Sequence, residues 1–481
     1  MSSPSEPVTV SDADSFVRVM TDACGLRAAI MLMTILLASI LFKLWLTPVE
    51  GLGPYSFVIT PDILQRVSEL LRDNPLELLL PQELESGRWL WCTSTFPVLF
   101  ILYKLISPLG VYILLSSVLI TTSFVTSWLA LRSLVFSSIV AFSLGFGTQL
   151  AYISTMGNTV AFYLFLSYVC VNLLIAVRLV LAPSPVPGLI AGFIMSLVVV
   201  AVSMEWWLNY AVCLVVGFGF VGAWERRHGV GQRGAGAALI AVVSLATLVL
   251  YLAIRLRVAA QYVSPGAEEE LLVTYRSWPL MVEDVVANFF TYMYITIGNY
   301  LPSFFFGSNS QTYLGDPIIL AGQNGYHPQK TQLVVMSHLF LWRFYAGVMV
   351  GFFCFAGIGW LRRALSRPVV EDVVMAALFL AVIAGCGTHL IIKYRPYISA
   401  PALGYKAVVS IFFFTLLMAY AAVAARRRFK HEVGYQATLA GLWSIILLGA
   451  VTRPAMLNVM LEHVGLEGYG DPLGMLRQLL H

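Results

Sequence analysis

Residues 109–131 read LGVYILLSSVLITTSFVTSWLAL, a run without a single charged side chain. About 20 apolar residues are enough for a helix to cross the hydrocarbon core of a bilayer, so this run predicts a membrane-spanning helix. The same signal recurs along the chain. The expected spans are 28–47, 109–131, 134–153, 159–182, 187–206, 208–224, 236–254, 333–360, 372–392, 403–425 and 436–452. The expected fold class is therefore all-α, a polytopic membrane protein with about 11 transmembrane helices.

The composition agrees with a surface that faces lipid. Hydrophobic residues make up 59% of the 481 residues and charged residues only 11%, and the mean hydropathy is +0.82. Soluble domains carry about 25% charged residues. The net charge of +4 gives no indication of a nucleic-acid partner. The six cysteines form no CxxC or CxxH pair, which favours small core residues over a zinc site or a disulfide scaffold.

The topology depends on the short apolar stretch 94–107, which contains Pro97. If this stretch crossed the membrane, the arginine clusters at 226–233, 362–367 and 426–430 could not share one side with the N-terminus. If it lies in the interface, all three clusters share that side, which the positive-inside rule favours. We therefore expect eleven spans, with a cytoplasmic N-terminus and with the C-terminus on the outer side.

This topology divides the chain into three parts. Residues 1–26 are polar and acidic, lack the basic start of a signal peptide, and are expected to form a cytoplasmic tail. Residues 27–454 form one membrane domain with outer loops 48–108 and 255–332. Residues 455–481 form an outer C-terminal tail. The expected location is the plasma or inner membrane, with membrane lipid as a partner.

The first outer loop contains a predicted amphipathic helix. Asp62 follows Pro61 at its start, and apolar residues at 63, 64, 67, 70 and 71 give one apolar face. Asp62 and Glu69 are seven residues apart, so they lie on one face about two turns apart. The helix alone is also compatible with solvated surface charges.

This region resembles the integral membrane glycosyltransferases of the GT-C superfamily, which include lipid-A aminoarabinose transferases and protein mannosyltransferases. In that family an acidic residue precedes an amphipathic helix, followed by an aromatic stretch and a Pro-containing apolar helix. Here Asp62 takes the first position, Arg88-Trp89-Leu90-Trp91 the aromatic stretch, and 95–110 the Pro-containing helix. The family's tandem acidic pair is reduced to Asp62 followed by Ile63, and one proline is missing.

A weaker resemblance extends over about 80% of the chain. The turn between the third and fourth spans, with Asn158, is similar to a family turn that carries a polar residue. The stretch Lys393-Tyr394-Arg395-Pro396-Tyr397 is similar to a late family segment. Lys393 and Arg395 also break the positive-inside pattern, which indicates either snorkelling to lipid headgroups or binding of an anion such as phosphate. His389, one turn earlier, could line the same place.

Two further charges lie in or beside predicted spans. Glu205 is at the end of one span, and Arg343 is inside another. Such charges cost about 2.5–3.5 kcal/mol on insertion scales and are candidates for binding substrate, although an interfacial residue or a structural ion pair is the simpler interpretation of each. The loop 255–332 places amides beside aromatic residues, a composition that suits sugar binding and also suits a plain loop.

The resemblance implies a glycosyltransferase that moves a sugar from a polyprenyl-phosphate donor to a lipid, glycan or protein acceptor at the outer face. It implies Asp62 as the general base, Glu69 for acceptor orientation or metal contact, and Lys393 and Arg395 for the phosphate. The substrate-binding candidates are Lys393, Arg395, His389, Asn158, Glu205 and Arg343. The sequence leaves open whether a divalent metal ion takes part. The alternatives are a lipid-linked oligosaccharide transporter and an O-antigen-type polymerase.

Overall fold

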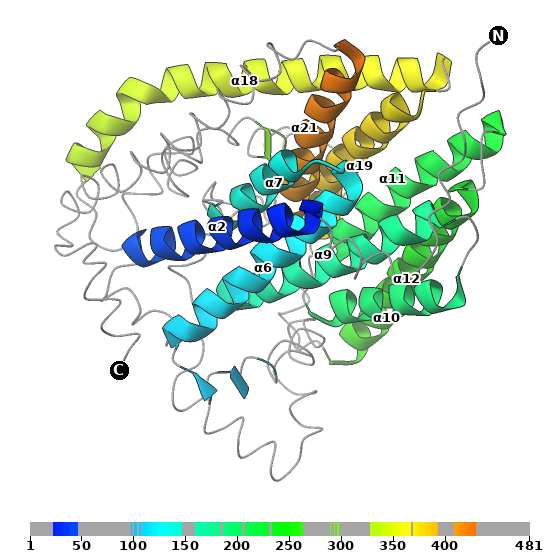
Figure 1. The fold of residues 1–481 in the computed structure, drawn as a ribbon, viewed down its shortest axis with the longest axis horizontal. Coiled ribbons are helices and arrows are strands. Elements are labelled where there is room, and N and C mark those ends of the chain that lie inside the picture. Colours follow the sequence, from blue (N-terminus) through cyan, green and yellow to red (C-terminus); the bar gives the residue numbers. More distant parts are fainter. Residues whose placement is uncertain are drawn as a thin grey trace.

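A computed structural model gives the arrangement of the helices (Figure 1). It describes residues 23–46, 98, 101–102, 105–106, 108–146, 159–182, 186–203, 207–229, 233–262, 289, 293, 296–297, 328–366, 369–392 and 408–429. Within these residues the secondary structure consists of helices joined by a few turn and connecting residues and contains no strand. The expectation of an all-α fold is confirmed for this part of the chain.

Ten helices make up the described bundle. They are α2 (Ala23–Leu46), α6 (Pro108–Leu131), α7 (Leu134–Phe146), α9 (Thr159–Leu181), α10 (Pro187–Ser203), α11 (Trp207–His228), α12 (Arg233–Tyr262), α18 (Pro328–Ser366), α19 (Val370–Ile392) and α21 (Val408–Phe429).

Seven of these helices contain a stretch that is long and apolar enough to cross a membrane. The stretches are Ile113–Leu131, Tyr163–Leu181, Trp207–His228, Gly234–Ala253, Gly347–Ser366, Val370–Gly387 and Val408–Ala425. Three further apolar helices, Arg27–Ala38, Leu134–Leu144 and Pro187–Ser203, are shorter. The expected span 436–452 lies outside the described residues. The chain is a multi-pass membrane protein, and the count of eleven spans stays a prediction.

Local sequence explains several helix ends. Pro108, Pro187 and Pro328 each occupy the first position of a helix, where the missing N–H has no intrahelical partner to lose. Helix α11 ends at His228 and is followed by Gly229, whose φ of 62° is the left-handed conformation common after a helix C-terminus. Arg132 adopts the same conformation, with φ of 53°, and so allows α6 to turn directly into α7.

Helix α11 lies at the centre of the packing, between α12 and α19. Its crossing with α12 is close because the residues there are small. A methyl group added at Gly222 would lie 3.0 Å from the backbone nitrogen of Ala238, whereas one at Gly219 would lie 3.7 Å from Cβ of Ala241. Small residues let membrane helices approach closely, so packing rather than apolar burial alone sets this interface.

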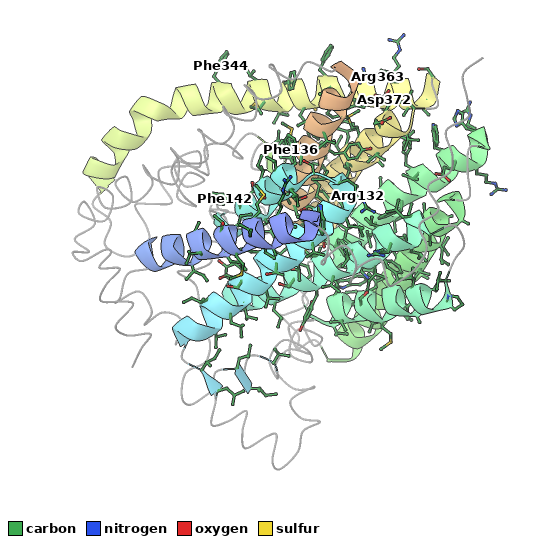
Figure 2. The ribbon with its side chains drawn as sticks, in the orientation of Figure 1. Arg132, Phe136, Phe142, Phe344, Arg363 and Asp372 are labelled. Carbon is green, nitrogen blue, oxygen red and sulfur yellow. The ribbon has the colours of Figure 1, made fainter. Side chains whose placement is uncertain are left out.

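Helix α18 runs along one edge of the bundle in Figure 1. Its 39 residues correspond to about 58 Å of helix, which exceeds the roughly 30 Å hydrocarbon core. Figure 2 shows Phe344 pointing away from the other helices, and 65% of its surface is exposed. By contrast, Phe136 and Phe142 of α7 are buried within the bundle.

The short stretch 94–107 is described at five positions. Val98 and Leu102 pack against the core, whereas Ile101 and Leu105 are exposed. Positions four apart share one face of a helix. Val98 and Leu102 therefore form a face that packs on the bundle, and Ile101 and Leu105 form an apolar face that is exposed. The location of this stretch in the membrane interface stays a prediction.

Contacts between helices define two ends of the bundle. We call one the Arg226 end: there Trp224 of α11 bonds Ala364 of α18, and Arg363 of α18 pairs with Asp372 of α19. We call the other the Trp207 end: Trp207, at the start of α11, meets Tyr251 in the later part of α12. Helix α11 therefore runs from the Trp207 end to the Arg226 end and α12 runs in the opposite direction, while α18 ends and α19 begins at the Arg226 end.

Candidate functional site

The predicted site residues fall largely outside what the structure describes. Asp62, Glu69, Asn158, Glu205, Lys393 and Arg395 are outside the described residues. His389 lies in α19 and Arg343 in α18, but the positions of their side chains are not described. The structure therefore brings none of the predicted catalytic or binding side chains into contact, and their roles stay predictions.

The helices next to these residues do share one end of the bundle. Asn158 directly precedes α9, Glu205 separates α10 from α11, and Lys393 directly follows α19. Cys213, early in α11, bonds the carbonyl of Ala381 at the midpoint of α19 and lies beside Gly385, whereas Gly217 lies beside Ala377. The two helices are therefore antiparallel, and the start of α11 is on the side of the end of α19. The last turn of α9 lies at the other end, where Leu179 meets Gly236 near the start of α12, so the start of α9 points toward the Trp207 end as well. The start of α9, the start of α11 and the end of α19 therefore all lie toward the Trp207 end.

The opposite end carries basic side chains. Arg178 is in the last turn of α9, Arg226 and Arg227 are in the last turn of α11, and Arg363 is in the last turn of α18. The start of α12 packs closely on the end of α9, since a methyl group at Gly236 of α12 would meet the carbonyl of Leu179 at 2.8 Å. The positive-inside rule predicts such arginines at a cytoplasmic face, whereas Arg255 and Arg257 of α12 follow Tyr251 at the other end.

Three helices meet at a buried polar cluster. The Tyr210 hydroxyl of α11 donates to Oδ1 of Asn172 in α9 at 2.7 Å. Asn172 Nδ2 in turn donates to Ser196 Oγ of α10 at 2.8 Å and to the carbonyl of Phe193 at 3.1 Å. The amide thus uses both its acceptor and its donors, which is how a buried polar group is kept stable in an apolar interior.

A second buried cluster surrounds Gly385 of α19. A methyl group at this position would lie 2.5 Å from Ser410 Oγ of α21 and 2.9 Å from the thiol sulfur of Cys213 in α11. Gly385 therefore lets α11, α19 and α21 meet. Cys170, Cys213 and Cys386 are buried free cysteines, which confirms the expectation of small core residues at these three positions.

Part of the predicted outer loop 255–332 packs against this region. Phe289, Met293, Thr296 and Ile297, which we call the docked face, are helical and follow the spacing of one side of a helix. Met293, Thr296 and Ile297 are at most 1% exposed. The Cys386 thiol donates to Thr296 Oγ1 over 3.6 Å, and the Phe289 ring lies beside Gly387. The docked face therefore contacts the last two turns of α19 before Lys393.

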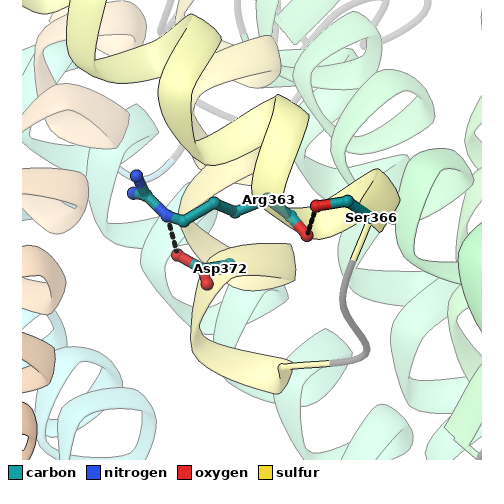
Figure 3. Close-up of polar contacts among 3 residues, drawn as sticks. All are labelled: Arg363, Ser366 and Asp372. Carbon is teal, nitrogen blue, oxygen red and sulfur yellow. Dashed lines mark hydrogen bonds and ion pairs between the residues drawn. The ribbon is translucent and has the colours of Figure 1, made fainter.

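An ion pair joins α18 and α19 at the Arg226 end (Figure 3). Arg363 Nε donates to Oδ1 of Asp372 at 3.0 Å, and the side chain of Asp372 is 1% exposed while that of Arg363 is 41% exposed. Asp372 lies in the first turn of α19, where the helix dipole also favours a negative charge. This pair fixes the short connection between the two helices.

Neither the two buried clusters nor the contact of the docked face with α19 was predicted from the sequence. A signal was present for the first, because Asn172 is an isolated amide in the apolar stretch 159–182, and such amides often bond a neighbouring helix. Thr296 and Cys386 carried no comparable signal, since they are 90 residues apart and belong to segments that were assigned to a loop and a span. Among the described residues, no group of three or more His, Cys, Asp or Glu side chains could hold a metal ion.

Comparisons with protein-family models, with curated proteins and with solved structures gave no match to this chain. The class that the described residues define is a multi-pass α-helical membrane protein. Hydrogen bonds between buried polar side chains connect several of its helices. Among the described residues, the arginines in the last turns of α9, α11 and α18 lie at the Arg226 end.

Proposed function

We propose that the protein is a membrane glycosyltransferase of the GT-C type. It moves a sugar from a polyprenyl-phosphate donor to a lipid, glycan or protein acceptor. In this proposal the Arg226 end faces the cytoplasm and the Trp207 end faces outward, so that the N-terminus is cytoplasmic. The proposal joins the resemblance of the first outer loop to that superfamily with the position of the helix ends in the bundle.

The observation that carries the proposal is the gathering of helix ends at the Trp207 end. Chain positions 158, 205 and 393 are far apart in sequence, yet each adjoins a helix end on this side of the bundle. A site assembled from several loops on one face of a rigid scaffold is the usual arrangement for catalytic and binding residues. The headgroup of a polyprenyl phosphate also lies at a membrane surface.

The residues have distinct roles in the proposed mechanism. Asp62 accepts the proton of the acceptor hydroxyl as it attacks the anomeric carbon of the donor sugar. The bond between that carbon and the phosphate oxygen breaks, and Lys393 and Arg395 stabilise the negative charge that develops on the departing polyprenyl phosphate. Glu69 orients the acceptor.

The test is incubation of the purified protein in lipid nanodiscs with candidate polyprenyl-phosphate sugars, with and without acceptor. Release of free polyprenyl phosphate that requires the acceptor supports the proposal. Movement of an intact lipid-linked saccharide across a vesicle membrane without bond cleavage would instead indicate a transporter. Formation of lengthened lipid-linked glycan from lipid-linked repeat units would indicate a polymerase.

A further inference from the structure

The docked face is a feature that neither the resemblance nor the proposed mechanism uses. Phe289, Met293, Thr296 and Ile297 belong to a segment that the topology assigns to an outer loop. In an outer loop of purely solvated residues, these side chains would be exposed. Met293 is instead 1% exposed and Ile297 is fully buried, so this part of the loop is integral to the helix bundle.

Two contacts join the docked face to α19. Cys386 and Gly387, two consecutive residues of α19, meet Thr296 and the Phe289 ring respectively. The Phe289 ring packs beside Gly387 without requiring a glycine there. A methyl group there would be 3.9 Å from the ring, an ordinary contact distance. The two consecutive contacts anchor α19 along its side, five to six residues before the helix ends at Ile392.

The other side of this part of α19 is also fixed. Gly385 packs against Ser410 of α21 and against Cys213 of α11. The last turns of α19 are thus held by α11, by α21 and by the docked face. Of these three, only the docked face belongs to the long segment between α12 and α18.

We propose that the docked face positions the C-terminal end of α19, from which Lys393 and Arg395 follow. It thereby couples the 255–332 loop to the phosphate-binding turn. Met293, Thr296 and Ile297 act as positioning residues: burial of Met293 and Ile297 supplies the attachment, and the Cys386–Thr296 contact sets its register along α19. The role in phosphate binding rests on the proposed function, whereas the attachment itself does not.

The test compares two double variants of the full chain. M293A/I297A removes most of the buried apolar surface of the docked face, and M293L/I297V keeps it. A nitroxide label at I392C, in a chain with Cys24, Cys92 and Cys354 replaced by serine, reports the mobility of the end of α19. The matched control is I240A, which removes a fully buried side chain from α12.

We expect the label to become more mobile in M293A/I297A and to stay unchanged in M293L/I297V and I240A. We also expect M293A/I297A to raise KM for the polyprenyl-phosphate donor with little change in kcat. Equal label mobility in all variants, or equal loosening by I240A, would overturn the attachment. A mobile label with an unchanged KM would overturn the role in donor binding. If the label becomes mobile in M293A/I297A but the parent chain releases no polyprenyl phosphate, the proposed function is contradicted. The attachment of the docked face to α19 is then still supported.

Discussion

The hydroxyl of Tyr210 in α11 donates a 2.7 Å hydrogen bond to Oδ1 of Asn172 in α9, and both side chains are almost completely shielded from solvent. The same Asn172 reaches Ser196 of α10. One amide therefore connects three helices that contribute ends to the Trp207 side of the bundle. Hydrogen bonds between membrane helices average about 0.6 kcal/mol and reach about 1.7 kcal/mol.

Replacing Tyr210 with phenylalanine should lower the free energy of unfolding by about 1 kcal/mol, because the buried Asn172 oxygen loses its donor. Thermal unfolding in a mild detergent measures the effect. The matched control is Tyr168→Phe in α9, which removes a hydroxyl from a half-buried tyrosine and should change stability less. Equal shifts for the two variants would show that the Tyr210 bond contributes nothing specific.

The crossing of α11 and α12 offers a pair of glycines with different surroundings. Gly222→Ala should destabilise the protein by roughly 1–3 kcal/mol, because the new methyl group would lie within 3.2 Å of the Ala238 backbone. Gly219→Ala should be neutral or slightly stabilising, since its methyl group meets only Cβ of Ala241 at 3.7 Å. Unfolding temperatures of the two variants check the difference. The opposite order would contradict the close crossing.

The contact between the docked face and α19 predicts a cross-link. Thr296→Cys would place a second thiol beside Cys386, because the present oxygen–sulfur distance is 3.6 Å. Mild oxidation should then form a disulfide that joins the two segments, detectable as a linked peptide pair by mass spectrometry. Adding Cys386→Ser should abolish it. Failure to cross-link would contradict the 3.6 Å contact between Thr296 and Cys386.

Sequence patterns predicted the helices better than the contacts between them. Length and apolar composition indicated α6 (109–131) and α9 (159–182) within one residue at each end. The predicted span 134–153 agrees with α7 over Leu134–Phe146, and its remaining residues, 147–153, lie outside the described residues. The predicted span 236–254 is shorter than α12, which continues through Arg255 and Arg257 to Tyr262.

The candidate site was predictable only as a side of the membrane. Charge distribution predicted which loops share a face, and the antiparallel packing of α11 and α19 is compatible with that grouping. The pairing of Thr296 with Cys386 was not predictable, since it depends on how a long loop returns to the bundle. The contacts of Asp62, Glu69, Lys393 and Arg395 lie outside the described residues, and their roles rest on the resemblance and on chemistry.

The role of the turn after α19 can be tested by comparing two arginines. Arg395→Ala should weaken donor use by roughly 1.5–3 kcal/mol in kcat/KM, because a charge-assisted contact to phosphate is lost. Arg276→Ala, in the other outer loop, is the control and should have little effect. Steady-state kinetics with a polyprenyl-phosphate sugar measures both. Indistinguishable kinetics would remove the phosphate role of Arg395.

The central claim is that the protein transfers a sugar by using Asp62 as the general base. The most direct measurement is the rate of polyprenyl phosphate release by the parent chain, by Asp62→Asn and by Asp73→Asn, each purified and shown to be folded. The parent chain should release polyprenyl phosphate in the presence of acceptor. Asp62→Asn should lose about 10²–10⁴-fold of this rate, the usual contribution of general-base catalysis, while Asp73→Asn stays near the parent rate. Near-normal turnover by Asp62→Asn, or no release by the parent chain with any donor, would contradict the account.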